Sequence, residues 1–232
     1  MIDINHISKT FKRSNEKYTA LVDVSLKIDK GDYISVSGLS GSGKSTLLNV
    51  IGGLIRPDAG EVIYKGESIY DQSGRFLNLY RKKDVGFMFQ QFHLMPYLTV
   101  VENIGLSCYQ KSHADAINDY LEKCSLVNIK DKYPSDLSVG EKQRAAFIRA
   151  IISNPELLLA DEPTGNLDPQ NSEILMTLIE EFHKKGGTVV LVSHDPTAIK
   201  YSNSNIKIGL GRIHIPAQTA AHLIPAFSLG IT

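Results

Sequence analysis

The sequence has no excess of charge of either sign and few cysteines. Lysine and arginine together number 25, as do aspartate and glutamate. The chain therefore lacks the broad positive field of a nucleic-acid-binding protein, and we expect no nucleic acid partner. Its two cysteines, Cys108 and Cys124, form no metal-ligand pattern, and residues 1–6 lack the basic and apolar regions of a signal peptide. These absences predict a protein of the reducing cytoplasm with two free thiols.

Long apolar runs and repeats are also missing. No run approaches the roughly 20 apolar residues that cross a bilayer, so we expect any membrane role to be carried out from the membrane surface. We find no internal repeat and no coiled coil of useful length. Residues 213–232 contain no aspartate, glutamate, lysine or arginine. This uncharged tail could pack on the chain's own core, contact a partner or be disordered, and the sequence leaves all three open.

What the sequence does contain is a glycine-rich loop between a strand and a helix. Residues 38–46, GLSGSGKST, match the pattern G-x-x-x-x-G-K-[ST], whose glycines let backbone N–H groups approach phosphate oxygens. Residues 33–37 alternate as a strand, and apolar residues within 47–51 indicate a helix whose positive end points at the anion. We therefore predict a nucleoside triphosphate site formed by Gly38, Ser40, Gly41, Ser42, Gly43, Lys44, Ser45 and Thr46.

The apolar pattern of the whole chain predicts an α/β fold. We expect helices within 91–152 and over 172–185, a hairpin over 61–69, and strands over 2–7, 20–28, 33–37, 85–90, 157–160 and 188–192. The predicted architecture is a P-loop NTPase core with a parallel central sheet, an N-terminal antiparallel β layer and an inserted α-helical subdomain. Within a single domain, 1–232, we assign the core to 1–90 and 153–212, the subdomain to 91–152 and the tail to 213–232.

An acidic pair follows one of the predicted buried strands. Asp161 and Glu162 come directly after residues 157–160, so both carboxylates should emerge at the same edge of the sheet as the phosphate loop. An aspartate there can hold Mg²⁺, and the adjacent glutamate can polarise a water for attack on the γ-phosphate. The alternative is a solvated acidic turn without chemistry.

Two other side chains have a functional and a structural interpretation. His194 follows the last predicted strand, where its imidazole could contact the γ-phosphate or the attacking water. It could equally be a structural histidine, because Asp195 and Pro196 already explain the local turn as the cap and first residue of a helix. Phe11 could be a core or edge aromatic, or a platform on which a nucleobase stacks.

A second helix start carries the features of an anion site. Ser138 and Glu141 form a capping box before a helix with an apolar face, and Gly140 lies between them. A well-capped helix without further function would look the same. However, a hydroxyl, a glycine amide and the helix dipole together favour an anion. Since the phosphate loop already has its own helix, we expect this start to face the nucleotide of a second molecule.

Together with Gln90 and residues 164–168, these motifs resemble the ATP-binding cassette ATPases in their order and approximate spacing, over residues 2 to 212. The resemblance implies that two copies close head to tail on ATP and Mg²⁺, each ATP lying between one phosphate loop and the other copy's signature helix. It also implies the residue roles: Phe11 stacks the adenine, Lys44 and Ser45 hold phosphate and metal, Asp161 and Gln90 complete the metal site, Glu162 is the general base, Ser138 and Gly140 reach the γ-phosphate in trans, Asp168 crosses the interface, and His194 is the switch histidine.

The sequence departs from the family at one place, because Val139 occupies the first glycine position of the usual Leu-Ser-Gly-Gly-Gln signature. A β-branched side chain restricts the backbone there and could crowd the nucleotide. We expect dimer closure to be weakened or retuned by this residue.

Within the family the chain resembles the cassettes of lipoprotein-release, macrolide and antimicrobial-peptide export systems and of cell division. It lacks the second cassette of translation ATPases and the coiled-coil insertion of chromosome-repair types, and a kinase would not need Glu162 or His194. We expect an ATPase subunit, peripheral on the inner face of the cell membrane, that contacts a separate transmembrane permease through residues 90–97. A mechanotransmission role without a transported solute and a small-molecule importer both stay open.

Overall fold

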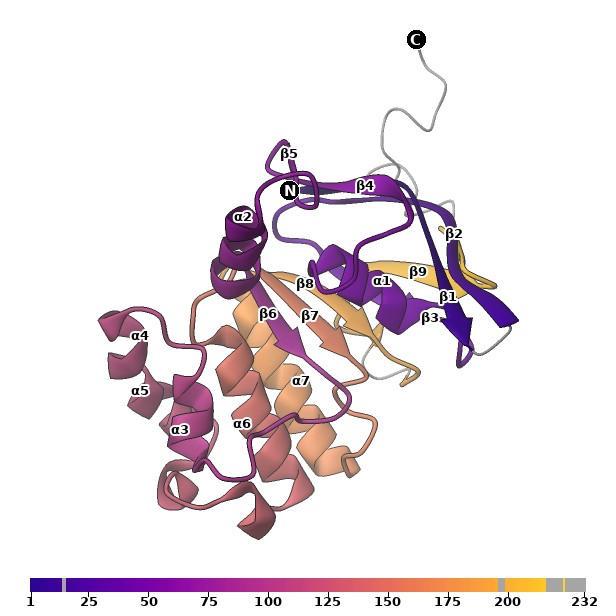
Figure 1. Ribbon diagram of the computed structural model, residues 1–232. Helices are drawn as coiled ribbons and strands as arrows, with labels where there is room; N and C mark the ends of the chain where they lie inside the picture. Colours follow the sequence, from indigo (N-terminus) through magenta and orange to yellow (C-terminus); the bar gives the residue numbers. More distant parts are fainter. Residues whose placement is uncertain (14–15, 196–198, 216–222, 224–232) are drawn as a thin grey trace.

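The computed structural model describes residues 1–13, 16–195, 199–215 and 223, and it confirms the predicted α/β fold (Figure 1). Its strands form two sheets, one mainly parallel and one antiparallel. The strands are β1 (Ile2–Arg13), β2 (Glu16–Ile28), β3 (Tyr33–Ser37), β4 (Ala59–Tyr64), β5 (Glu67–Ser68), β6 (Val85–Met88), β7 (Leu157–Asp161), β8 (Thr188–Val192), β9 (Ser204–Gly209) and β10 (Arg212–His214).

The central sheet has the strand order β10-β9-β3-β8-β7-β6. Strands β9, β3, β8, β7 and β6 are parallel to their neighbours, and β10 returns antiparallel to β9. Strand β8 therefore lies between β3, which leads into the phosphate loop, and β7, which leads to the acidic pair. Because parallel strands end at the same edge, the predicted site residues after these three strands are gathered at one rim of the sheet.

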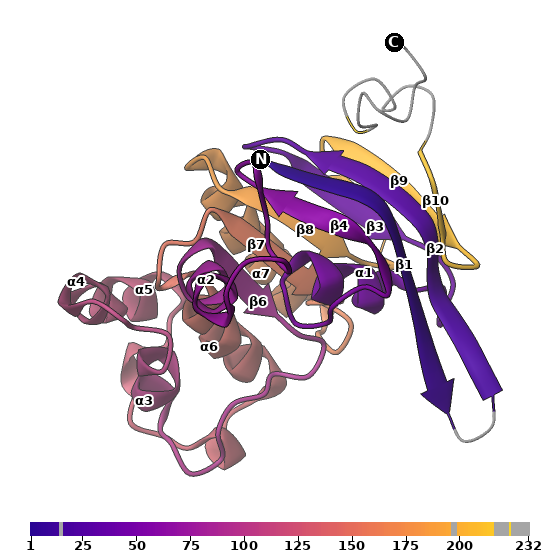
Figure 2. The same cartoon turned by 45° about the horizontal axis from the view of Figure 1, so that its top comes forward.

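The antiparallel sheet, β2-β1-β4-β5, packs over helix α1 (Lys44–Ile51) and the β9–β10 end of the central sheet (Figure 2). Strands β1 and β2 are longer than the predicted 2–7 and 20–28. Their outer halves pair through the backbone, as in the partners Phe11 and Tyr18, but their side chains are mostly solvent-exposed. A strand that buries neither face shows no apolar alternation, which is why the pattern did not reveal this extension.

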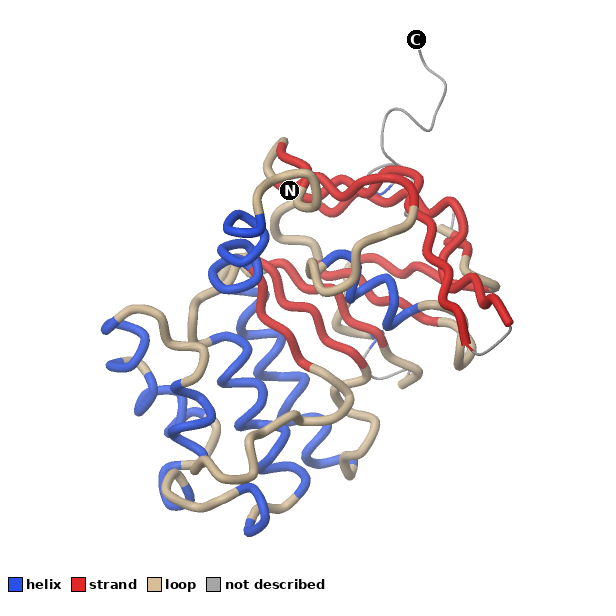
Figure 3. The backbone as a smooth tube through the Cα atoms, in the orientation of Figure 1, coloured by secondary structure: helices blue, strands red, loops and turns tan. Residues whose placement is uncertain are grey.

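The helices cover both faces of the central sheet. Figure 3 shows α6 and α7 on one face and α1 on the other. Alternate residues of β7 enter two separate cores, with Leu157 and Leu159 facing α1, and Leu158 and Ala160 facing α6 and α7. The helices after α1 are α2 (Gly74–Leu79), α3 (Val100–Gly105), α4 (Lys111–Asp115), α5 (Ile117–Lys123), α6 (Val139–Ile151) and α7 (Pro169–Lys184), with a π-helical turn η1 (Tyr80–Asp84) and 3₁₀ turns η2 (Val127–Ile129) and η3 (Pro134–Asp136).

Some predicted boundaries are wrong by a few residues. Helix α7 begins at Pro169 and not at residue 172, because the Asp168 carboxylate accepts the Asn171 N–H at 2.9 Å and proline suits the first helical position. The segment predicted to be helical from residue 91 forms its first helix at Val100, where Thr99 and Glu102 make a capping box. Strand β6 ends at Met88, two residues earlier than predicted.

The cysteines, the absence of a membrane-spanning helix and the uncharged tail were also predicted. Both cysteines are free, as predicted. Within the part of the chain that the structure describes, no helix is long and apolar enough to span a membrane. Pro196 and most of the uncharged tail lie outside the described residues. Of the tail, residues 213–215 and 223 are described, and Leu223 is buried in the core that contains α1.

Candidate functional site

The phosphate loop follows β3, and its glycines are required by close backbone contacts. A Cβ at Gly38 would lie 2.2 Å from the Ile208 carbonyl oxygen, and one at Gly43 would lie 2.1 Å from the Ala20 carbonyl oxygen. Both glycines also have positive φ, 150° and 108° respectively. A side chain is therefore excluded at these two positions by contact as well as by conformation. The loop is wedged between the two sheets at the start of α1.

The loop carries two buried polar side chains, Lys44 and Ser42, beside the start of α1. Lys44 is 5% exposed, and its ammonium donates to the carbonyl oxygens of Gly38 and Leu39 at 2.8 and 3.0 Å. The Ser42 hydroxyl oxygen is buried and has no hydrogen-bond partner, and the start of α1 has no side-chain cap. A buried ammonium, an unpaired hydroxyl and uncapped amides fit phosphate oxygens, which can accept from all of them.

Asp161 occupies the end of β7 and contacts the start of α1. Its carboxylate accepts a hydrogen bond from the Ser45 hydroxyl, and burial raises the pKa of this carboxyl while the Ser45 bond opposes the increase. A serine hydroxyl and a carboxylate are oxygen ligands of the type that Mg²⁺ prefers. The predicted metal residues Ser45 and Asp161 are therefore in contact, and they fit a magnesium ion bound together with phosphate oxygens.

The side chains of Glu162, His194 and Gln90 converge at the same rim. Glu162 Oε1 lies 3.0 Å from His194 Nε2, and the Gln90 amide reaches Glu162 Oε2 at 3.5 Å. The Glu162 backbone has φ 46°, and its N–H donates to the Val192 carbonyl at 2.9 Å. This left-handed backbone, held by the neighbouring strand, turns the carboxylate away from the strand direction towards its two partners. The structure thus brings together three predicted residues that lie up to 104 positions apart.

The predicted signature segment starts helix α6. Ser138 and Glu141 form the complete capping box, and the Ser138 N–H holds the pKa of the Glu141 carboxyl below its usual range. Val139 is 43% exposed at the first helical position. At Gly140 a Cβ would meet the Asn171 amide oxygen at 2.4 Å. The sequence therefore departs from the family pattern where a side chain has room and keeps glycine where it has none.

Two connections from α6 to the segment after β7 were not found from the sequence. The Arg144 guanidinium donates to the Asn171 amide oxygen at 2.7 Å, and the Asn171 amide nitrogen donates to the Asp168 carboxylate at 2.6 Å. The buried Gln143 amide donates to the Pro163 carbonyl at 2.7 Å. Because the partners are 20 or more residues apart for Gln143 and Arg144, no local pattern could identify them. Helix α6 is thereby attached on both sides of the loop that follows Glu162.

The signature segment lies away from the phosphate loop of its own chain. Figures 1 and 2 show the first turn of α6 at the lower end of the molecule, whereas α1 starts between the two sheets. The start of α6, which carries the predicted signature, is therefore separate from the start of α1, which carries the phosphate loop. Phe11 lies on the β1–β2 hairpin with 36% of its surface exposed, which agrees with an edge position and leaves its ring accessible.

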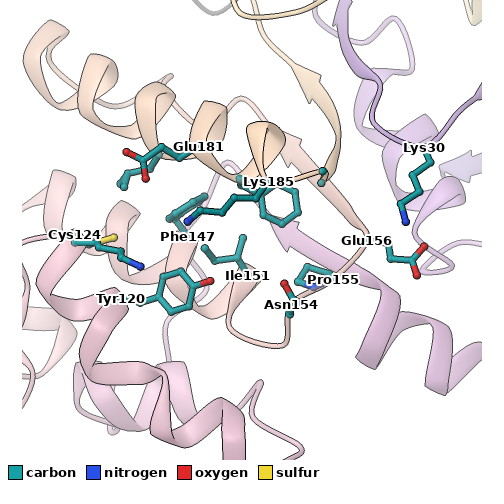
Figure 4. Close-up of a pocket in the computed structure, with 15 residues that line it drawn as sticks. Lys30, Tyr120, Cys124, Phe147, Ile151, Asn154, Pro155, Glu156, Glu181 and Lys185 are labelled. Carbon is teal, nitrogen blue, oxygen red and sulfur yellow. The ribbon is translucent and has the colours of Figure 1, made fainter.

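Two pockets lie outside the rim. One, of about 160 Å³, is formed where α5, α6 and α7 end, and Figure 4 shows Tyr120, Phe147 and Ile151 beside Lys185 in it. Burial raises the pKa of the Cys124 thiol in its wall to about 12, which disfavours the reactive thiolate. Among the residues that the structure describes, those that line this pocket include no predicted site residue. A second pocket, of about 480 Å³, lies between η1, β6 and the end of α6 and includes Phe87 and Phe89.

Several known proteins are similar to this chain in sequence. The chain matches the ABC transporter family over residues 21–165. It is 38% identical over 222 residues to the lipoprotein-releasing system ATP-binding protein LolD of Francisella tularensis, a match that covers 93% of this chain and 96% of LolD. It is 37% identical over 207 residues to the macrolide export ATP-binding/permease protein MacB of Chlorobaculum tepidum, a match that covers 88% of this chain and 32% of MacB.

A solved structure extends the similarity to the fold. The ATP-binding cassette MJ0796, in a dimeric post-hydrolysis state bound to ADP and Pi, aligns with a TM-score of 0.86 at 34% identity, over 92% of this chain and 97% of that chain. Sequence and fold therefore agree over nearly the whole length of both proteins. The chain belongs to the ABC transporter family and is an ATP-binding subunit of the kind that hydrolyses ATP.

Proposed function

We propose that two copies of this chain close head to tail on two ATP molecules and transmit that closure to a separate transmembrane subunit. The observation that carries the proposal is the separation of the signature segment from the rim. In one chain α1 starts between the two sheets and α6 starts in the lower part of the molecule, so a second copy is needed to place both helix starts around one nucleotide. The dimeric state of the relative MJ0796 supports this arrangement.

In this dimer each rim residue has the task that its resemblance to the family implies. Phe11 stacks the adenine, and Lys44, released from the loop carbonyls, binds the β and γ phosphates. Ser45 and Asp161, with Gln90, hold Mg²⁺, which neutralises charge on the phosphates. Residues 91–152 act as the subdomain that carries Ser138 and Gly140 to the partner's γ-phosphate, and Asp168 lies at the interface.

Hydrolysis is assigned to the pair Glu162 and His194. The Glu162 carboxylate takes a proton from the attacking water as the water oxygen bonds to the γ-phosphorus and the bond to ADP breaks. His194, 3.0 Å from the same carboxylate, orients it in the resting site and turns to the γ-phosphate on closure. The Gln90 amide, at 3.5 Å, connects the carboxylate to the segment 90–97 that faces the proposed permease.

The test of the hydrolytic assignment is Glu162→Gln. This variant keeps the size and shape of the side chain, but its amide cannot accept the water proton. We expect ATP binding to be retained, turnover to fall by about 100-fold or more, and a dimer to accumulate with ATP, measured by phosphate release and by size-exclusion chromatography with light scattering. Glu122→Gln, at an exposed position of α5, is the matched control. Turnover of Glu162→Gln at the parent rate would exclude the general-base role.

The proposed contact with the permease is the pocket of about 480 Å³ between η1, β6 and the end of α6. Its wall contains Phe87 and Phe89, stacked at 5.0 Å, and the partly exposed Leu54. The Arg149 guanidinium bonds the carbonyl oxygens of residues 92 and 93 at 2.7 and 2.6 Å, which fixes the adjoining segment. The lining also contains Arg81 and Lys82, so the pocket combines aromatic and aliphatic side chains with positive charge. Such a pocket beside the Gln90 segment suits an amphipathic helix end of a membrane protein.

The variant Leu54→Glu tests this contact, and Leu79→Glu is its matched control. The two leucines are 43% and 40% exposed, but Leu79 does not line the pocket. We expect Leu54→Glu to lose co-purification with a multi-span protein from membranes, and Leu79→Glu to keep it, with ATP turnover of the isolated subunits unchanged. Equal retention by both variants would place the permease elsewhere on the surface.

We propose export or extraction of a lipoprotein, peptide or drug-like substrate at the inner face of the cell membrane. The similarity to LolD and MacB supports this direction, and MacB carries cassette and permease in one chain. The identity of the co-purified membrane protein decides between this role, a small-molecule importer, and a mechanotransmission complex that moves no solute.

A further inference from the structure

The outer half of the β1–β2 hairpin presents two aromatic rings side by side. Phe11 and Tyr18 are direct Cα partners in the antiparallel ladder, so their side chains lie on the same face of the hairpin. The two side chains are 36% and 49% exposed. Phe11 is the proposed platform for the adenine, whereas Tyr18 has had no role in the site so far.

Tyr18 connects this hairpin to the phosphate loop. Its hydroxyl donates a hydrogen bond to the Gly41 carbonyl oxygen. Gly41 has φ 76°, in the left-handed region, and a Cβ built on it would lie 3.9 Å from the Tyr18 hydroxyl. The tyrosine therefore spans the gap between the antiparallel sheet and the loop and touches the loop at a backbone turn.

The contact fixes the orientation of one peptide unit of the loop. The peptide between Gly41 and Ser42 accepts from Tyr18 through its carbonyl and donates from its N–H to the Leu39 carbonyl at 3.1 Å. The next carbonyl, that of Ser42, accepts from the Gly211 N–H at 3.2 Å. The N–H of the Gly41–Ser42 peptide closes the turn on Leu39, so the bond from Tyr18 holds this turn in place rather than freeing that amide. The C=O and N–H of a planar peptide point in opposite directions. Holding the turn and the Ser42 carbonyl from outside therefore sets the direction of the amide that follows, that of Gly43, at the start of α1.

We propose that Tyr18 is a positioning residue for the nucleotide: through the Gly41 carbonyl it presets the phosphate-binding amides and fixes their distance from the adenine platform at Phe11. The inference rests on the proposed nucleotide site. It differs from the role of Phe11, because Tyr18 acts on the phosphate end and Phe11 on the base. The two roles are separable with a ligand that has phosphates and no base.

The experiment compares the binding of ATP and of inorganic triphosphate to the whole chain by isothermal titration calorimetry. Tyr18→Phe removes the hydroxyl and keeps the ring. We expect it to weaken both ligands by the same factor of about five, the loss typical of one neutral hydrogen bond. Phe11→Ala should weaken ATP and leave inorganic triphosphate within about twofold, since stacking contributes only with the base.

Tyr109→Phe, which changes a tyrosine between α3 and α4, is the matched control and should leave both affinities unchanged. A thermal midpoint within about 2 °C of the parent shows that Tyr18→Phe is folded. Unchanged or tighter binding of both ligands to Tyr18→Phe would overturn the proposal, as would a loss confined to ATP. Failure of the parent chain to bind either ligand would instead contradict the nucleotide site itself.

Discussion

Helices α1 and α6 both begin beside a proposed phosphate position, but their first turns are satisfied in different ways. The start of α1 has Gly43 in the left-handed region and no side-chain cap, whereas α6 begins with a complete capping box from Ser138 and Glu141. The amides of α1 are therefore left for a ligand. The first amides of α6 are partly occupied by the capping box. The Ser138 hydroxyl proton is still available to donate to an anion.

The two starts also differ in burial. Lys44 and Ser42, at α1, are 5% and 6% exposed between two sheets. Val139, at α6, is 43% exposed on the outside of the molecule. The difference suggests that the α1 site is built to bind nucleotide in a single subunit, and that the α6 site contributes only when a second subunit covers it. Variants at each start can separate these two behaviours.

The largest effect is expected at α1. Lys44→Ala removes the buried ammonium that would bind the β and γ phosphates. We expect the affinity of the monomer for ATP to fall by about 100-fold, equivalent to ~2.7 kcal/mol. The measurement is equilibrium binding of a fluorescent nucleotide, with Lys123→Ala on α5 as the control. An affinity of Lys44→Ala within about threefold of the parent value would remove the contrast between the two helices.

A smaller effect is expected at the start of α6. Ser138→Ala deletes the cap and the proposed contact with the partner's nucleotide. Loss of the cap should cost about 1 kcal/mol and lower the thermal midpoint by about 3 °C. We also expect turnover to fall by about tenfold while ATP affinity of the monomer stays unchanged. Ser135→Ala, in η3, is the control. A weaker affinity of the Ser138→Ala monomer would mean that α6 serves its own subunit's nucleotide.

The smallest effect is expected from Val139→Gly. The valine side chain is exposed, so its removal loses little packing, and more space becomes available to an approaching nucleotide. We expect turnover to rise by about threefold, equivalent to ~0.7 kcal/mol, and dimerisation with ATP to improve. Gly140→Ala should do the opposite, because its methyl group would meet Asn171 at 2.4 Å. Turnover and dimerisation of Val139→Gly no better than the parent would show that the valine does not hinder closure.

Much of the rim could be predicted because its signals are local. The apolar runs at β7 and β8 predicted buried parallel strands, and their carboxyl ends then placed Asp161 and His194 at one edge. Strand β9 was not predicted, although its residues alternate: Ile206 and Ile208 are buried, and Asn205 and Lys207 are exposed. The roles assigned to the rim residues stay predictions until the variants are measured.

Other features depend on tertiary contacts and left no local trace. The outer half of the β1–β2 hairpin exposes its side chains, so its strand structure depends on backbone pairing between β1 and β2 and not on side-chain burial. The bonds from Tyr18 to Gly41 and from Arg144 to Asn171 join residues 23 and 27 positions apart. Tyrosine, arginine and asparagine are ordinary surface residues in a sequence, and only the packing of their elements gives them partners.

The Asn171 side chain connects the first turns of α6 to the loop at Asp168 through a chain of hydrogen bonds. It takes a bond from Arg144 on one side and gives one to Asp168 on the other, and Gly140 packs directly against it. A displacement of the first turns of α6 would therefore be felt at Asp168 through side-chain contacts at Asn171. Each subunit would then act as a transmission between two ATP molecules, in addition to covering one of them.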